Sequence, residues 1–412
     1  MNTRLFDPYL DSMNFLNEIC SRFPTAVSFG SGRPKEEFYH VETITNGARE
    51  YAVHKYGSEQ YFDKLGQYNL TKGIICQEVA YLLEKDEGII ASPEDIIITD
   101  GAQEGMQILI NTLFASDKDV LLVSDPSYVG FVGYAKIYGT DIRAIRRTKY
   151  GIDLNDLEDK LCSLIRESKN PVALYEVPDF HNPTGYCMPV KDRKELLYLA
   201  EKYGFYIIED NPYGYYCFEG ERMPTIKSLD KSKNVIYIGS FSKSVFPSIR
   251  LGYIITDAIV KTHRTVNLSE ECKKTKSFTT VNSSALLQAM LGNLLIREDY
   301  SLLNYCREKV AYCKNNRDII AKYIEENVKY INNWEKPSGG FFCTLEIPFF
   351  PTDEIVNTFA DKFGVIVCPM KMFYLNQEDA GKELRLSYSY LSPEQIQIGM
   401  ERLCACIDVL SK

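Results

Sequence analysis

Histidine is scarce in this chain. Its only histidines are His40, His54, His181 and His263. None has HExxH or other metal-ligand spacing, so no zinc site or other metal site is expected. The twelve cysteines include no CxxC pair. The close pair Cys404 and Cys406 lies in a helical pattern, where residues two apart do not face each other. We therefore expect reduced structural thiols, as in a cytoplasmic protein.

An excess of positive charge is also lacking, since 56 acidic and 47 basic residues leave a formal net charge of -9. Nucleic acids and anionic membrane surfaces bind basic patches, so neither is expected as a partner. No apolar run approaches the length of a membrane span. The first residues, Met1 to Pro8, contain no apolar signal core. These absences together predict a cytoplasmic protein whose partners are neither nucleic acids nor anionic membranes.

The chain does have an ordinary globular composition, 45% hydrophobic and 25% charged, and enough length for a large core. From about residue 96, short apolar runs alternate with helical spacers. These runs are 96–99, 120–124, 172–177, 205–209, 235–239 and 251–255. The alternation is typical of an α/β fold with a mostly parallel central sheet and flanking helices.

Polar or aromatic residues follow several of these runs. In such sheets ligands bind outside the carboxyl ends of the strands, so these side chains are predicted to converge on one pocket. Each of them alone also fits a structural role, such as a turn, a cap or a core position. The convergent set is Gln103, Tyr128, Asn182, Asp210, Tyr213 and Lys243.

Lys243 is predicted to lie in a loop just past a buried strand. Hydroxyl residues flank it at Ser240 and Ser242, and Arg250 follows seven positions later. A lysine amine forms a Schiff base with a carbonyl. Hydroxyls and a guanidinium can hold a phosphate. The stretch therefore fits either a pyridoxal phosphate site or, by itself, a solvated loop lysine. A glycine turn at 101–105, where a helix begins, is a second phosphate candidate.

The remaining segments complete the domain prediction. A short helix within 9–27 precedes an irregular glycine loop at 30–34, and residues 41–90 are mostly helical in pattern. After about 290 we expect long helices between 300 and 327, strands at 342–347, 365–369 and 383–388, and a helix near 353–363. Arg385 in the last strand is either a solvated residue or a carboxylate ligand. We predict an N-terminal segment 1–45 that joins the small domain, a large domain 46–290 and a small α+β domain 291–412.

Six motifs together resemble the fold-type I, class I/II pyridoxal-phosphate-dependent aminotransferases. They occur in that family's order and cover nearly the whole chain. They are Gly101-Ala102-Gln103, Asp125-Pro126-Ser127-Tyr128, Asn182-Pro183-Thr184-Gly185, Asp210-Asn211-Pro212-Tyr213, Ser240-Phe241-Ser242-Lys243 with Arg250-Leu251-Gly252, and Leu384-Arg385-Leu386-Ser387.

The resemblance implies a role for each motif. Lys243 would form the internal Schiff base and move a proton during transfer through a pyridoxamine phosphate intermediate. Asp210 would pair with the pyridine nitrogen, Asn182 and Tyr213 with the 3-oxygen, and Tyr128 would stack on the ring. The phosphate ligands would be Ala102, Gln103, Ser240, Ser242 and Arg250. Arg385, Asn182 and Gly32 would bind the substrate, with Arg385 on its carboxylate. Tyr68 would reach the partner's phosphate in a homodimer whose sites lie at the interface.

A finer resemblance involves segments 12–19, 32–38, 67–75 and 177–180. These are similar to the aminotransferases that make hydroxyphenylglycine-type amino acids in secondary metabolism. The resemblance implies an aromatic or arylglycine-type amino acid and a 2-oxo acid as substrates. Two alternatives remain at this point. One is a cyclase, lyase, decarboxylase or oxidase that uses the same cofactor, and the other is a ligand-sensing regulator, for which the basic DNA-binding surface is missing.

Overall fold

The computed structural model describes residues 1–261, 264–327, 331 and 333–412. Its centre is a seven-stranded sheet in the order β2-β10-β9-β8-β7-β3-β4. Only β10 runs antiparallel to its neighbours, so the mostly parallel sheet predicted from the sequence is confirmed. The strands are β2 (Ile96–Thr99), β3 (Asp119–Ser124), β4 (Asp141–Ile145), β7 (Asn170–Glu176), β8 (Tyr206–Asn211), β9 (Val235–Ser240) and β10 (Gly252–Ile255).

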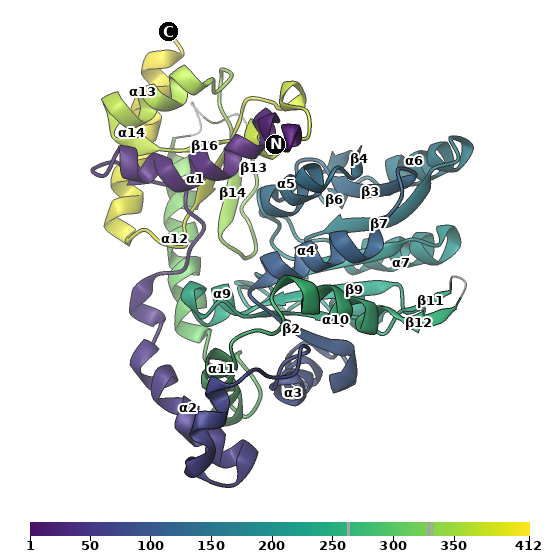
Figure 1. Cartoon of the computed structure of the whole chain (residues 1–412). Coiled ribbons are helices and arrows are strands. Elements are labelled where there is room, and N and C mark those ends of the chain that lie inside the picture. Colours follow the sequence, from purple (N-terminus) through teal and green to yellow (C-terminus); the bar gives the residue numbers. More distant parts are fainter. Residues whose placement is uncertain (262–263, 328–330, 332) are drawn as a thin grey trace.

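Helices cover both faces of this sheet (Figure 1). Strand residues alternate between the two faces: Leu121 packs in one core with α4 and α5, and Leu122 packs in another with α6 and α7. Helices α3 and α11 pack against β2 in a further core. The helices are α3 (Cys76–Glu87), α4 (Ala102–Leu113), α5 (Val129–Tyr138), α6 (Leu154–Arg166), α7 (Val190–Tyr203), α10 (Leu268–Thr279) and α11 (Ala285–Arg297).

A second, four-stranded sheet is built from the C-terminal part of the chain, in the order β13-β14-β17-β16. The N-terminus lies at the same end of the molecule (Figure 1), and β1 pairs in parallel with β15. The strands are β1 (Val27–Ser28), β13 (Asn333–Trp334), β14 (Phe342–Glu346), β15 (Val365–Ile366), β16 (Cys368–Pro369) and β17 (Glu383–Ser387). The helices at this end are α1 (Asp11–Arg22), α12 (Arg307–Glu326), α13 (Asp353–Phe363) and α14 (Pro393–Leu410). Helix α2 (Val41–Tyr56) lies at the opposite end of the molecule, beside α11 (Figure 1).

Short elements complete the architecture. They are the short helices α8 (Ile226–Leu229) and α9 (Phe241–Ser244), the paired strands β5 (Arg147–Thr148) and β6 (Gly151–Ile152), and the paired strands β11 (Ile259–Lys261) and β12 (Thr265–Asn267). The 3-10 helices are η1 (Thr3–Phe6), η2 (Pro8–Leu10), η3 (Glu36–Phe38), η4 (Glu59–Gly66), η5 (Pro93–Asp95), η6 (Pro247–Ile249), η8 (Met370–Phe373) and η9 (Gln377–Asp379).

Side-chain caps explain where several helices begin. Asp153 accepts hydrogen bonds from two backbone amides at the start of α6. Ser392 and Gln395 form a reciprocal capping box at the start of α14. These caps satisfy N–H groups that have no partner within the helix. No helix in the described ranges combines the length and the apolar character needed to cross a membrane.

Three predictions about local structure are wrong. Lys243 lies in the short helix α9 and not in a loop, because Ser240 caps that helix with its side chain. The predicted long helix at 300–327 begins only at Arg307. Segment 365–369 forms two strands in different sheets, because β15 pairs with β1 and β16 pairs with β17. Both predicted domain boundaries fall inside helices, α2 and α11, and the division into domains stays a prediction.

Candidate active site

A cavity of about 650 Å³ lies where the carboxyl ends of the central strands meet the small sheet. Every predicted site residue except Tyr68 lines it. These residues are Gly32, Ala102, Gln103, Tyr128, Asn182, Asp210, Tyr213, Ser240, Ser242, Lys243, Arg250 and Arg385. A larger cavity of about 1050 Å³ is lined by residues that include Thr184 and Gly185. None of the predicted site residues lines it. The smaller cavity is therefore the candidate active site.

Lys243 points its amine into this cavity. Nζ donates a hydrogen bond to the carbonyl oxygen of Gly32 at 2.7 Å. Burial, together with the nearby positive charges of Arg250 and Arg385, lowers the pKa of the amine to about 8. A lowered pKa increases the fraction of neutral amine, which is the nucleophilic form.

The backbone around Lys243 is held from two sides. The Tyr216 hydroxyl donates to the carbonyl of Lys243 at 2.8 Å. The buried amine of Lys309, on α12, donates to the carbonyl of Val245 at 3.1 Å and also to that of Ser244. These contacts satisfy carbonyl groups at the end of α9, and so they fix the helix that carries Lys243.

Asp210 lies near the end of β8 and is 3% exposed. Its Oδ2 accepts a hydrogen bond from the Tyr175 hydroxyl at 2.7 Å. Its Oδ1 is buried and has no hydrogen-bond partner among the described residues. Burial raises the pKa of Asp210 to about 7, although the Tyr175 hydrogen bond acts in the opposite direction. A buried carboxylate oxygen without a donor is an acceptor for a ligand that brings one.

Arg385, on β17, closes the cavity from the small sheet. It donates to Oδ1 of Asn182 at 2.9 Å and to the carbonyl of Gly30. Its guanidinium lies over the rings of Phe342 and Phe373, at 4.5 and 4.8 Å from their centroids. Its buried Nε has no partner within the described part of the chain. A guanidinium held in this way still has donors to offer to a carboxylate.

Gly32 is required here by close packing. A Cβ at this position would overlap the ring of Phe342. Its carbonyl faces Lys243, and Gly30 two residues earlier faces Arg385. The glycine loop predicted to bring bare backbone close to a ligand therefore contacts both Lys243 and Arg385 through its carbonyl groups.

The opposite end of the cavity has the composition of an anion site. Gly101 adopts a φ of 77°, and α4 begins at the next residue. Arg250 donates to the carbonyl of Asp100 at 3.3 Å, so its guanidinium lies beside this helix N-terminus. Ser240 and Ser242 line the same cavity. The side-chain nitrogen of Gln103 is engaged elsewhere, because it donates to the carbonyl of Gly130 at 3.0 Å.

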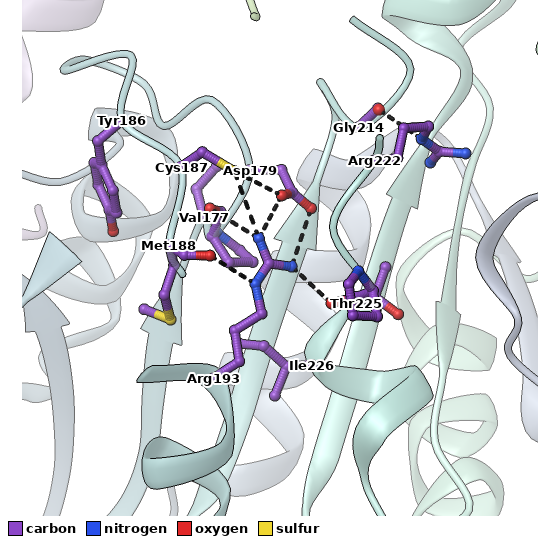
Figure 2. A network of polar contacts seen from close by, with 12 residues as sticks. Val177, Asp179, Tyr186, Cys187, Met188, Arg193, Gly214, Arg222, Thr225 and Ile226 are labelled. Atoms are coloured by element: carbon purple, nitrogen blue, oxygen red, sulfur yellow. Dashed lines mark hydrogen bonds and ion pairs between the residues drawn. The ribbon is translucent and has the colours of Figure 1, made fainter. Parts of the chain in front are cut away.

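The loop that carries Asn182 is fixed at its base by Arg193, on α7 (Figure 2). Arg193 is fully buried and forms an ion pair with Asp179. It also donates to the carbonyl of Met188 at 2.9 Å and to that of Pro178 at 3.4 Å, one from each side of the loop. A third carbonyl, of Pro224, accepts at 3.0 Å. One buried cation thus holds the loop closed and keeps Asn182 at the cavity.

Tyr68 does not lie in the cavity of its own chain. It follows η4, and its side chain is 80% exposed. A largely exposed tyrosine outside the cavity is compatible with the predicted contact to a partner subunit.

Sequence reasoning missed four residues that shape the site, namely Phe342, Phe373, Tyr175 and Arg193. Two of them had a signal in the chain: Phe342 is the second residue after the pair Gly339-Gly340, and Tyr175 lies in the strand that leads to Asn182. Phe373 and Arg193 had none, because their contacts join segments that are far apart or belong to an ordinary helical pattern.

Comparisons with known proteins identify the family of this chain. The family model described as Aminotransferase class I and II matches residues 27–403. The chain is 38% identical over 410 residues to (S)-3,5-dihydroxyphenylglycine transaminase of Amycolatopsis orientalis, covering 98% of this chain and 92% of that protein. It is 29% identical to aromatic-amino-acid aminotransferase 1 of Thermococcus litoralis, covering 92% and 88%. The crystal structure of a multiple substrate aminotransferase from Thermococcus profundus superposes with a TM-score of 0.84 at 28% identity, covering 96% and 94%.

Proposed function

The chain belongs to the class I and II aminotransferases, which use pyridoxal 5'-phosphate, and from this premise we propose that it transfers amino groups between an aromatic or arylglycine-type amino acid and a 2-oxo acid. The observation that carries this proposal is the meeting of three groups in one cavity: an amine of lowered pKa, a buried carboxylate oxygen without a donor, and a guanidinium. The cyclase, lyase and oxidase alternatives have no support from the relatives.

The residues present fit pyridoxal phosphate. When bound, the cofactor supplies an aldehyde for a lysine amine and an electron-withdrawing ring that stabilises negative charge at the substrate Cα. The free Oδ1 of Asp210 would accept the ring N–H. Asn182 and Tyr213 would face the 3-oxygen, and Tyr128 would cover the ring. Ala102, Gln103, Ser240, Ser242 and Arg250 would hold the phosphate at the N-terminus of α4. Gln103 would do so through its backbone N–H.

Lys243 would have two tasks. As a neutral amine it binds the cofactor aldehyde, and once released it moves a proton at the substrate Cα. Its lowered pKa suits both tasks near neutral pH. Gly32 would hold the free amine through its carbonyl, as it does in this structure.

Arg385 would bind the substrate carboxylate. Its hydrogen bond to Asn182 and its contacts with the rings of Phe342 and Phe373 would hold the guanidinium in place. The same two rings give the cavity an apolar wall next to the carboxylate site. A side chain whose aromatic ring is bonded directly to Cα would lie near that wall. This wall and the activities named for the two curated relatives support an aromatic or arylglycine-type substrate.

The proposed functional unit is a homodimer with its sites at the interface. Tyr68 is exposed in its own chain and would reach the phosphate of the partner's site. Mixed dimers test this directly. Lys243→Ala and Tyr68→Ala subunits should each form impaired homodimers, but a mixed dimer regains one complete site, with Lys243 from one subunit and Tyr68 from the other. Activity that does not rise on mixing would refute the shared site.

Two further proposals concern organisation. We propose that the chain is divided into an N-terminal segment, a large domain that carries Lys243 and a small C-terminal domain that carries Arg385. We also propose a cytoplasmic location, supported by twelve free cysteines.

The proposed activity is tested by adding amino acids, one at a time, to the purified holoenzyme and recording its visible spectrum. We expect conversion of the cofactor to its amine form, reversed by a 2-oxo acid, with arylglycine and aromatic amino acids reacting faster than alanine. A cofactor that binds but is never converted to the amine form would overturn transamination. A preference for aliphatic donors would overturn the substrate class.

A further inference from the structure

The carboxylate of Asp210 is held asymmetrically. Tyr175 donates its hydroxyl to Oδ2 at 2.7 Å, whereas Oδ1 has no donor among the described residues. No lysine, arginine or histidine in the described ranges forms an ion pair with this carboxylate. Within the described part of the chain, the hydroxyl of Tyr175 is therefore the one side-chain donor to this carboxylate.

We propose that Tyr175 is a positioning residue, whose hydroxyl turns Asp210 so that Oδ1 faces the cavity and accepts a protonated ring nitrogen. This inference rests on the proposed function, in which Asp210 faces the pyridine ring. It adds that the ring is held in its protonated form only while Tyr175 holds the other oxygen. The ligand class that this pair selects is a cationic heteroaromatic N–H.

Tyr175 is rigid enough for this role. It lies in β7, is fully buried and stacks on Phe131 of α5, with ring centroids 4.0 Å apart and planes inclined by 9°. Strand β7 pairs in parallel with β8, which carries Asp210, and Tyr175 lies opposite Ile208 in that pairing. Pairing and stacking fix the tyrosine ring, so its hydroxyl position is set before any ligand binds.

The same hydrogen bond controls the charge of Asp210. Burial raises the pKa of Asp210 to about 7, and the Tyr175 hydrogen bond opposes that rise. Without the hydroxyl the pKa would rise further, and the carboxyl group would be protonated over more of the neutral range. The other titratable groups nearby, Tyr128 and Tyr213, have raised pKa values and stay neutral there. A protonated Asp210 would present a donor, or a weaker acceptor, to the ring.

A purely structural role makes a different prediction. If Tyr175 only stabilised the core, its loss would lower the free energy of unfolding without changing the protonation of a bound ring. The decisive readout is therefore the ring nitrogen itself, observed by NMR in holoenzyme loaded with cofactor that carries ¹⁵N in the ring.

Tyr175→Phe is the principal variant, since it removes one oxygen and keeps the stack on Phe131. In the unmodified protein we expect a ring nitrogen that stays protonated between about pH 6 and about pH 9. In Tyr175→Phe we expect it to lose its proton within that range. The affinity of the empty protein for pyridoxal phosphate should fall about tenfold or more, as for a hydrogen bond to a charged group. For an analogue with carbon in place of the ring nitrogen, the affinity should change less than about twofold.

Three further variants separate the possible outcomes. Tyr388→Phe is the matched control, because this buried tyrosine donates to the carbonyl of Gly339 at 2.9 Å and does not contact Asp210. It should leave the ring titration unchanged. Phe131→Leu removes the stacking and keeps the hydroxyl. It should shift the ring titration part of the way, which also tests the inference if Tyr175→Phe does not fold.

The variant Asp210→Asn separates the proposed role of Asp210 from the proposed role of Tyr175. If Asp210→Asn leaves the ring nitrogen protonated, the proposed role of Asp210 fails. If Asp210→Asn changes it but Tyr175→Phe and Phe131→Leu do not, only the role of Tyr175 is overturned. An equal loss of affinity for the cofactor and for its carbon analogue in Tyr175→Phe would also overturn that role, because the effect would then not involve the ring nitrogen.

Discussion

Arg385 donates a hydrogen bond to Oδ1 of Asn182 at 2.9 Å, across a sequence separation of 203 residues. This contact joins β17 of the small sheet to the loop that follows β7 of the large one. In the proposed function the first residue binds the substrate carboxylate and the second faces the cofactor. A single hydrogen bond therefore sets the position of one binding group relative to the other.

Loss of Arg385 should mainly weaken substrate binding. In Arg385→Ala we expect KM for amino acids to rise about 100-fold or more, because a buried charge-assisted pair to the carboxylate is lost. Amines that have the same side chain and no carboxylate should react equally well with both proteins. Steady-state kinetics with matched amino acid and amine pairs measures the difference, and an unchanged KM would refute the carboxylate role.

Loss of Lys243 should remove the chemistry. Lys243→Ala should lower turnover by about 10²- to 10⁴-fold or more, because a positioned proton-transfer group is lost, and should remove the visible band of lysine-bound cofactor. Lys243→Arg is the matched control for charge and should be equally inactive, since a guanidinium stays protonated. Absorption spectroscopy and turnover test both variants, and activity retained in either one contradicts the assignment.

The reaction of the empty protein with pyridoxal phosphate should depend on pH through Lys243. The pKa of the amine is lowered to about 8, and the neutral amine is the reactive form. The rate should therefore rise about tenfold per pH unit below about pH 8 and become constant above it. Stopped-flow absorbance measures this profile. Arg385→Ala removes a nearby positive charge, so its profile should shift to higher pH, and an identical profile would contradict the electrostatic cause.

The ion pair between Arg193 and Asp179 should be important for stability. Removing one partner of a buried pair leaves the other charge unpaired, so Arg193→Ala should lower the free energy of unfolding by about 3–5 kcal/mol. Urea unfolding measures this change. Lys202→Ala, which breaks the exposed pair with Glu158, is the control and should have little effect. Equal effects of the two variants would show that Arg193 does not hold the Asn182 loop in the way described.

Much of this protein can be derived from its sequence alone. The alternation of apolar runs and helical spacers predicts the parallel sheet, because strands buried on both faces must be apolar throughout. Asp210 lies near the end of β8 and Asn182 lies in the loop that follows β7, and parallel strands bring their carboxyl ends to one edge. Their meeting in one cavity is therefore a consequence of chain order, and so is the position of Lys243 after β9.

Tertiary structure alone decided the contacts between distant segments. The carbonyl of Gly32 accepts a hydrogen bond from Lys243, Phe342 and Phe373 lie close to Arg385, and Arg193 donates to carbonyls of the Asn182 loop. None of these contacts has a sequence period or a fixed spacing. Only the folded chain could show which oxygen of Asp210 is free, because the other is occupied by Tyr175 on the neighbouring strand. Sequence order determines which residues reach the cavity, and three-dimensional packing determines which of their atoms remain available to a ligand.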